Sequence, residues 1–192
     1  KSDRQLDGVC DAHTRDGAAL VSFFASLEEA HTSGQTVTET QAADQLEAFR
    51  AQQPDFRGLS FPTISSTGPN GAIIHYAPPE KGSPPVDAND LYVCDSGAHF
   101  AFGTTDVTRT FHFGSPTAEQ RRCFTRVLPG HLASDQRSFP GTVTGYVIDA
   151  LARAPGWRDH LEYRHGTGHG VGHYLNVPEP PMGIGMRAVF NE

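Results

Sequence analysis

A run of alternating glycines around residue 170 restricts the folding of this chain more than any other feature. Within RHGTGHGVGHYLNV, glycine stands at positions 166, 168, 170 and 172. Glycine in a helix interior costs about 1 kcal/mol relative to alanine, so this density of glycines makes a helix very unfavourable. The segment is therefore predicted to be extended, with room on the glycine side for another group to approach the backbone.

Three histidines share this glycine-rich segment. His165, His169 and His173 lie four residues apart, and in an extended chain such even offsets put their imidazoles on one face. Imidazoles gathered on one face could bind a metal ion or transfer protons. The alternative is a loop whose histidines are only solvated, and the shared phase of all three favours the functional site.

Two aspartates lie on either side of a glycine-containing turn. Asp95 ends the apolar strand LYVCD, and Asp106 begins the alternating segment DVTRTFHF. A hairpin can bring two such carboxylates together. Like charges are buried favourably only when cations lie between them, so a convergent pair beside a histidine indicates divalent metals. Both could equally be turn carboxylates that bond to the local backbone, and the spacing leaves the two interpretations open.

The predicted elements form two similar halves. Helices are predicted over 3–31, from Thr38 to before Pro54, from Ser115-Pro116 onward, and over about 144–154. Strands are predicted on both sides of a turn within 60–76, at 91–95, at 106–113 beyond a turn bracketed by Gly97 and Gly103, and at 161–165. The order helix, helix, strands occurs twice, which predicts one duplicated α+β domain over residues 1–192.

Composition argues against several classes of protein. Acidic residues outnumber basic ones, 22 to 15, so the chain lacks the positive surface that nucleic-acid binding requires. No apolar run approaches the roughly 20 residues of a membrane-spanning helix, and the first residues, KSDRQLDG, contain no signal-peptide stretch. The three cysteines form no CxxC pair, which indicates neither a disulfide framework nor a thiolate zinc site. A reducing cytosol therefore fits best.

Several other residues have both a functional and a structural interpretation. His75 closes the apolar stretch AIIHY and could be a partly buried strand histidine or a proton donor near metals. Arg109 and Glu179 could orient a substrate, although pairing on the surface is the commoner role. Cys94, beside Asp95, is predicted to be a core side chain. The sequence contains no GxSxG motif, so hydrolysis by a serine nucleophile has no support.

Three long strings carry a family resemblance that extends over nearly the whole chain. They are FPTISSTGPNGAIIHY, DSGAHFAFGTTDVTRTFHFGSPT and YRHGTGHGVGHYLNV. Together they resemble the catalytic domain of the aminopeptidase P family, the Xaa-Pro aminopeptidases, and most closely its cytosolic form. The resemblance implies a pita-bread fold, in which duplicated helix, helix, strand halves surround a curved antiparallel sheet.

The resemblance also implies a site and a reaction. In the family, two divalent metal ions, usually Mn²⁺ with Zn²⁺ or Co²⁺ as alternatives, share a bridging hydroxide between two aspartates, one histidine and two glutamates. The matching metal ligands here are Asp95, Asp106 and His169, and the histidines that bind substrate or move protons match His75 and His165. The implied cytoplasmic enzyme removes the N-terminal residue from peptides with proline second. A homodimer is an open possibility for its assembly.

Some positions depart from the family pattern. Pro178, in NVPEPP, stands where close relatives have a further site histidine, and His173 matches no functional position. The family's two glutamate ligands lie on later strands, and Glu192 resembles a loop residue that precedes them, so the chain resembles a C-terminally truncated domain. We therefore expect the chain alone to bind metals weakly.

Two alternative functions remain. One is a non-catalytic pita-bread module that binds peptides or proteins through the cleft. The other is a related methionine aminopeptidase, prolidase or creatinase, which shares the types of metal ligand but matches the long strings less well.

Overall fold

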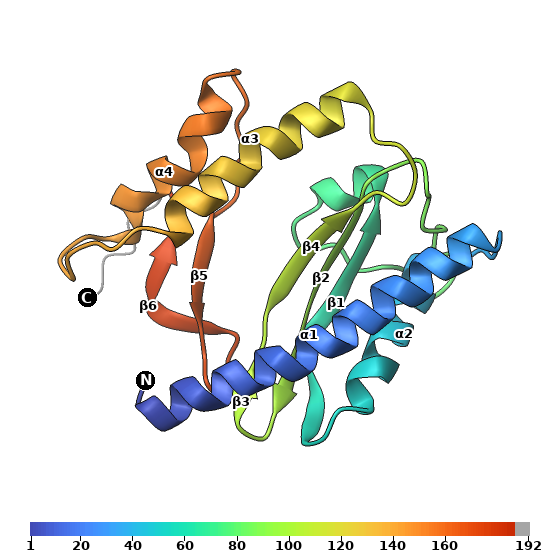
Figure 1. Ribbon diagram of the computed structural model, residues 1–192, viewed down its shortest axis with the longest axis horizontal. Coiled ribbons are helices and arrows are strands. Elements are labelled where there is room, and N and C mark those ends of the chain that lie inside the picture. The colour runs from blue at the N-terminus through green and yellow to red at the C-terminus, as the bar shows by residue number, and fades with distance from the viewer. Residues whose placement is uncertain (187–192) are drawn as a thin grey trace. The chain divides into compact units, whose positions relative to one another are not determined.

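The computed structural model describes residues 1–186, which form two compact units (Figure 1). The first unit comprises residues 1–115 and 171–177, and the second comprises residues 116–170 and the described residues from 178 onward. Each unit begins with two helices and continues into strands. The predicted α+β class and the repeated order of elements are therefore confirmed, whereas the single domain over 1–192 stays a prediction.

Two helices cover one face of the sheet in the first unit. α1 (Asp3–Thr32) and α2 (Glu39–Ala51) begin where the sequence predicted, and each begins at a capping box. Their apolar sides pack against side chains of β2 and of the preceding loop. The buried residues of this core are Leu20, Phe23, Leu27, Ala42, Leu46, Val86, Tyr92 and Cys94.

The sheet of the first unit is antiparallel, and β2 lies at its centre. Its strands are β1 (Phe56–Thr67), β2 (Tyr92–Phe100), β3 (Gly103–Thr104) and β4 (Val107–Phe111), and β2 pairs with all three others (Figure 1). The strands predicted at 91–95 and 106–113 are confirmed. However, β2 continues through Gly97, so the turn is shorter than the glycines suggested.

The second strand predicted within 60–76 is wrong. β1 ends at Thr67 and is followed by a 3-10 helix, η1 (Gly68–Ala72), and by a turn over residues 73–76, the remainder of AIIHY. The Tyr76 hydroxyl donates a 2.7 Å hydrogen bond to the buried carboxylate of Glu39. This long-range polar contact fixes the turn, and the apolar composition of AIIHY gave no sign of it.

The second unit consists of α3 (Ala118–Asp135), α4 (Gly145–Trp157) and a two-stranded sheet of β5 (Gly168–Val171) and β6 (Pro178–Ile184). The first helix begins slightly later than predicted, because Thr117 and Gln120 form a capping box there. The second continues past its predicted end, with Pro155 in its last turn. Proline has no N–H to donate to the carbonyl of Leu151, four residues earlier, so the helix passes Pro155 with that hydrogen bond missing.

Residues 161–165 form irregular backbone, so the strand predicted there is wrong. The carbonyl groups of Tyr163 and His165 accept hydrogen bonds from the guanidinium of Arg153. Each of these carbonyls thus has a hydrogen-bond partner without pairing to a neighbouring strand. A buried side chain from α4 therefore determines the path of this segment.

Both helices of the second unit carry exposed apolar side chains. They are Phe124, Val127, Leu128, Leu132, Tyr146, Val147, Leu151 and Trp157.

Among residues 1–186, no helix combines the length and the apolar character that crossing a membrane requires.

Alkylation should distinguish Cys94 from Cys10. Cys94 is 1% exposed, which confirms its predicted core position, and burial raises the pKa of its thiol to about 11, whereas Cys10 is exposed. The thiolate is the reactive form, so iodoacetamide at about pH 8 should label Cys10 at least about a hundredfold faster. Mass spectrometry of the peptides measures both rates. Unfolding in urea should make the rates similar, and rapid labelling of native Cys94 would contradict its burial.

Candidate functional site

Asp95 lies in the middle of β2, on the face that points away from α1 and α2. Tyr92 and Cys94 belong to the core beneath these helices, and side chains alternate between the two faces along a strand. Asp95 therefore faces the other side, where Thr108 of β4 lies opposite it. Its Oδ1 atom is buried and has no hydrogen-bond partner among residues 1–186. Burying a carboxylate oxygen without a partner costs free energy unless a cation or a hydrogen-bond donor reaches it.

Asp106 directly precedes β4, and the strand register relates it to Asp95. It lies two residues before Thr108, so continuing the alternation of β4 puts Asp106 on the same face of the sheet as Asp95. A side chain at Gly97 would collide with the carbonyl oxygen of Thr105. Glycine at this position therefore lets the segment before β4 approach β2 closely. That the two aspartates bind a metal together stays a prediction.

The donor set of this face suits a divalent cation, although it is incomplete. Carboxylate oxygens are the preferred ligands of hard cations, and Asp95 offers an oxygen that lacks another partner within the described part of the chain. In residues 1–186, no group of three or more His, Cys, Asp or Glu side chains is arranged to hold a metal ion. Asp95 and Asp106 belong to the first unit and His169 to the second, so the structure describes these predicted ligands separately.

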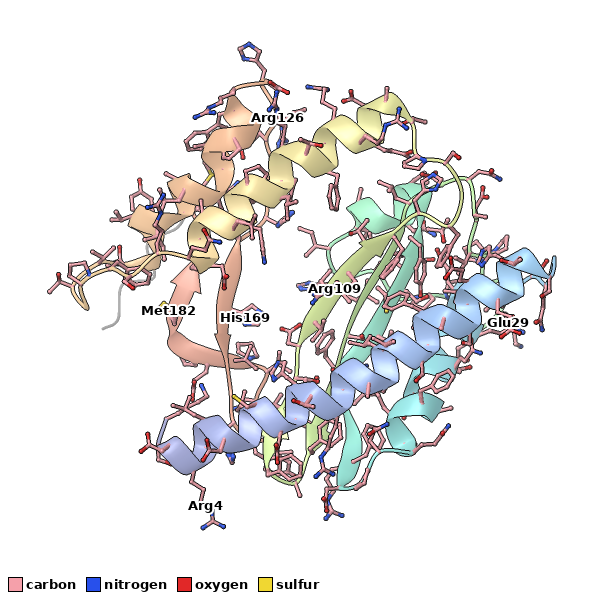
Figure 2. All side chains as sticks on the ribbon, viewed as in Figure 1. Arg4, Glu29, Arg109, Arg126, His169 and Met182 are labelled. Atoms are coloured by element: carbon pink, nitrogen blue, oxygen red, sulfur yellow. The ribbon has the colours of Figure 1, made fainter. Side chains whose placement is uncertain are left out.

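The glycine-rich segment is extended over only part of its length. His169 lies on β5 (Figure 2), whereas His165 precedes this strand and His173 follows it. The prediction that one strand carries all three histidines is therefore wrong. The Nδ1 atom of His169 bonds to the Gly170 carbonyl at 3.0 Å. A proton on Nδ1 leaves the lone pair on Nε2, which is the form of imidazole that binds a metal ion.

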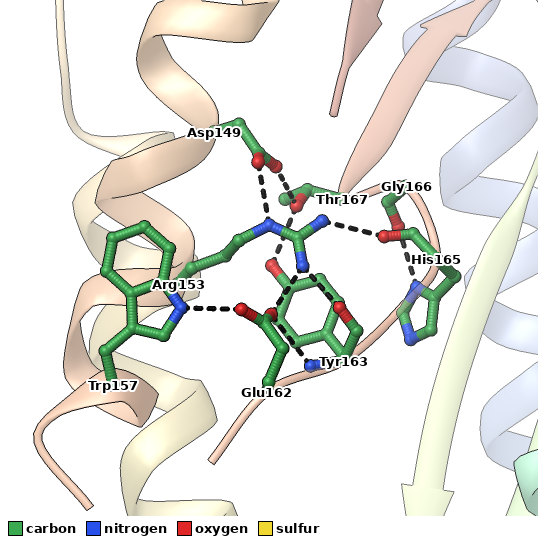
Figure 3. A network of polar contacts seen from close by, with 8 residues as sticks. All are labelled: Asp149, Arg153, Trp157, Glu162, Tyr163, His165, Gly166 and Thr167. Atoms are coloured by element: carbon green, nitrogen blue, oxygen red, sulfur yellow. Dashed lines mark hydrogen bonds and ion pairs between the residues drawn. The ribbon is translucent and has the colours of Figure 1, made fainter. Parts of the chain in front are cut away.

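Arg153 lies at the centre of a polar network next to His165 (Figure 3). Its side chain is 1% exposed and forms ion pairs with Asp149 at 2.7 Å and with Glu162 at 2.8 Å. The same guanidinium stacks over the Tyr163 ring, 4.0 Å from its centroid. A hydrogen bond from Trp157, followed by the one from Arg153, lowers the pKa of the Glu162 carboxyl.

This network holds the backbone that leads into β5. Arg153 donates to the His165 carbonyl at 2.7 Å, and the Thr167 hydroxyl donates to Asp149. The His165 ring in turn bonds to the Gly166 carbonyl through Nδ1 at 2.7 Å. This network was not predicted from the sequence, although Asp149 and Arg153 have the i, i+4 spacing of a helical ion pair.

A cavity of about 640 Å³ lies within the second unit, beside the Arg153 network. Its wall is formed by α3, by α4 and by the irregular segment between α4 and β5. The lining includes Val127, His131, Ala152, Arg153, Leu161, Tyr163, His165 and Thr167. Of the predicted site residues, His165 therefore contributes to a concave surface.

His75 occupies an exposed turn, so its interpretation as a partly buried strand histidine is wrong. The neighbouring Tyr76 bonds to Glu39, and burial together with Glu39 raises the pKa of this tyrosine to about 12. The Thr67 backbone N–H donates to the same carboxylate at 2.6 Å. His75 is thus presented by an anchored turn, and its part in proton transfer stays a prediction.

Arg109, Pro178 and Glu179, which the sequence also singled out, lie on strands β4 and β6. Arg109 lies on the exposed part of β4 (Figure 2), where its guanidinium donates to the Thr108 carbonyl at 2.8 Å. Pro178 is the first residue of β6, and Glu179 follows it. Glu192 lies outside the described residues.

Comparison with known proteins places the chain in a family. The profile of metallopeptidase family M24 matches residues 8–190. Two curated proteins named probable Xaa-Pro aminopeptidase P, from Laccaria bicolor and Coprinopsis cinerea, are 58% and 56% identical over 191 and 187 residues. These alignments cover 100% and 97% of this chain and 30% of each relative, so the chain spans about a third of their length.

Solved structures support the fold. X-prolyl aminopeptidase from Caenorhabditis elegans, described as a cytosolic enzyme with a di-nuclear active site, gives a TM-score of 0.93 at 44% identity over 97% of this chain and 31% of its own. Prolidase from Pyrococcus furiosus gives 0.83 at 24% identity over 97% of this chain and 52% of its own, which supports the fold alone. The predicted pita-bread fold is confirmed. The chain therefore belongs to metallopeptidase family M24.

Proposed function

We propose that this chain forms the metal-binding part of an Xaa-Pro aminopeptidase, which hydrolyses the N-terminal residue from peptides with proline second. The observation that carries the proposal is the aspartate pair on one face of the sheet, with a buried Asp95 oxygen that lacks a partner among the described residues. The names of the relatives support this choice of substrate. The cytosolic description of the Caenorhabditis elegans enzyme supports the cytoplasm as the compartment.

Each predicted site residue has a distinct task in this proposal. Asp95 and Asp106 would hold two divalent ions, Mn²⁺ being the first choice, and His169 would bind through Nε2. When bound, such ions polarise the scissile carbonyl and lower the pKa of a water molecule. His75 and His165 would bind the peptide and hold or transfer a proton at the leaving amine.

Substitution of Asp95 by asparagine tests the site directly. Asn keeps the shape of the side chain but removes its charge, so we expect the affinity for Mn²⁺ to fall about a hundredfold. The electron paramagnetic resonance signal of free Mn²⁺ measures this affinity even when binding is weak. Asp87→Asn is the matched control, because Asp87 is exposed and accepts its hydrogen bonds from Asn89. Equal affinity in Asp95→Asn and in the unsubstituted chain would eliminate the proposed site.

The 192-residue chain by itself is expected to hold two Mn²⁺ ions weakly and to have little aminopeptidase activity. The predicted ligands Asp95, Asp106 and His169 number three, whereas two neighbouring cations need carboxylates on both sides to offset their charge. Calorimetric titration with Mn²⁺ and an assay on an Xaa-Pro peptide measure both properties in parallel. Two tight sites with rapid turnover would refute the expectation and would indicate that Glu179, Glu192 or a second copy supplies ligands.

A non-catalytic binding module is the second candidate, and the proline at the start of β6 favours it. By family resemblance, Pro178 replaces a site histidine and cannot transfer protons. The aspartate pair favours the enzyme, because a binding module has no chemical need for metal ligands. Capture of a proline-containing peptide that persists after chelation of metals would support the module.

A further inference from the structure

A fully buried ion pair joins the two helices of the first unit. Arg50 of α2 donates from Nε to Asp16 Oδ1 at 2.6 Å and from Nη2 to Oδ2 at 3.1 Å. Both side chains are 0% exposed. A buried pair of charges contributes little net stability unless its remaining polar atoms are also bonded. The remaining polar atoms of this pair bond to β2 and to the residue before Asp106.

The guanidinium of this pair reaches β2 directly beside Asp95. Arg50 Nη2 donates to the Ser96 hydroxyl at 3.1 Å, and Nη1 donates to the Gly97 carbonyl at 3.4 Å. Ser96 follows Asp95 in the strand and faces the helices, so Asp95 faces the opposite side. The ion pair thus bonds to β2 from the helix side of the sheet, next to the predicted metal ligand Asp95.

The carboxylate of the pair reaches the residue before Asp106. The Thr105 hydroxyl donates to Asp16 Oδ2 at 2.7 Å and accepts from the Ala98 backbone N–H at 2.9 Å. The Thr105 carbonyl accepts from the Ser60 hydroxyl at 2.8 Å. Thr105 is fully buried and bonded through both its side chain and its backbone. These hydrogen bonds therefore hold the backbone directly before Asp106 in place.

We propose that Asp16 and Arg50 are positioning residues that set the separation of Asp95 and Asp106. One ion pair bonds to the neighbour of each aspartate and acts through the sheet from the helix side. Two carboxylates on one face repel each other before a cation binds. A rigid connection behind the sheet opposes that repulsion and keeps the ligands ready for the cation. This inference rests on the metal site proposed above.

Thr105→Val tests the connection with a small change of shape. Valine removes the hydroxyl that bonds to Asp16, and we expect the affinity for Mn²⁺ to fall about tenfold, as is typical when a group that orients a metal ligand is lost. Thr105→Ser keeps the hydroxyl and should restore most of the affinity. Thr104→Val is the matched control, because Thr104 is equally buried and bonds to His99 Nδ1 at 2.9 Å. This control should change the affinity less than about twofold.

Nuclear magnetic resonance of aspartate labelled with carbon-13 at its carboxyl provides a readout that does not require metal. In Thr105→Val the signal of Asp106 should broaden or split, while in Thr104→Val it should stay single. Unfolding of both variants in urea shows whether they lose similar stability, so that a general loss of stability is separated from the local effect.

The two proposals fail in different ways. If the unsubstituted chain binds no Mn²⁺, the metal site is wrong, and the Asp106 signal still decides whether Thr105 orders this residue. If Mn²⁺ binds but Thr105→Val leaves both the affinity and the Asp106 signal unchanged, the positioning role is overturned.

Discussion

Replacing Arg50 with methionine is expected to lower the free energy of unfolding of the first unit by about 3–5 kcal/mol. Methionine keeps most of the side-chain length, but the Asp16 carboxylate then stays buried at 0% exposure without its cation. The Ser96 hydroxyl and the Gly97 carbonyl lose a donor as well. An uncompensated buried charge is among the most costly changes that a core can undergo.

The measurement for Arg50→Met is urea denaturation, with hydrogen exchange of the β2 amide groups as a local probe. Arg15→Met is the control, because Arg15 pairs with Asp55 at 3.6 Å with side chains 31% and 48% exposed, and should cost less than about 1 kcal/mol. The double variant Asp16→Leu with Arg50→Met removes both charges and should recover part of the loss. A loss below about 1 kcal/mol in Arg50→Met would contradict the burial of this pair.

Replacing Arg153 with methionine should destabilise the second unit by a similar amount, about 3–5 kcal/mol. The Asp149 carboxylate would be left buried without its cation, since the side chains of this pair are 4% and 1% exposed. The carbonyls of Tyr163 and His165 would lose their side-chain donor. We therefore expect the irregular segment before β5 to lose its fixed path together with the unit's stability.

The fluorescence of Trp157 measures the effect of Arg153→Met, because this residue is the only tryptophan in the sequence and belongs to the same network. Its Nε1 donates to Glu162 at 2.8 Å, so the emission reports directly on the partners of Arg153. Arg122→Met is the control: Arg122 pairs with Glu119 at 2.6 Å, but the two side chains are 41% and 63% exposed. Equal unfolding midpoints for both variants would contradict the central role of Arg153.

The two buried arginines, Arg50 and Arg153, have corresponding positions in the two units. Arg50 comes from the second helix of the first unit and Arg153 from the second helix of the second unit. Each pairs with a helical aspartate and also donates to a backbone carbonyl near the predicted site, that of Gly97 for Arg50 and that of His165 for Arg153. A buried ion pair adds little net stability compared with apolar side chains of similar volume, whereas removing one partner is costly because the other charge stays buried.

Local chemistry made the helices of the first unit predictable from the sequence. Ser2 with Gln5 and Thr38 with Gln41 form capping boxes at the starts of the two helices, and such an interaction spans only three residues and needs no tertiary partner. The apolar run LYVCD located β2, and the alternation in DVTRTFHF located β4. The long matching strings implied the family, which the comparisons confirmed.

Tertiary contacts decided the features that local sequence patterns could not predict. Tyr76 bonds to Glu39 across 37 residues. The segment AIIHY therefore forms a turn, although its apolar composition predicted a strand. Thr105 bonds to Asp16 across 89 residues, a contact that no local pattern indicates. The sequence by itself determined where the two helices of the first unit begin and where β2 and β4 lie, and its long strings indicated the family. Only the tertiary structure decided which polar groups are buried together, because a buried charge depends on partners that are distant in the chain.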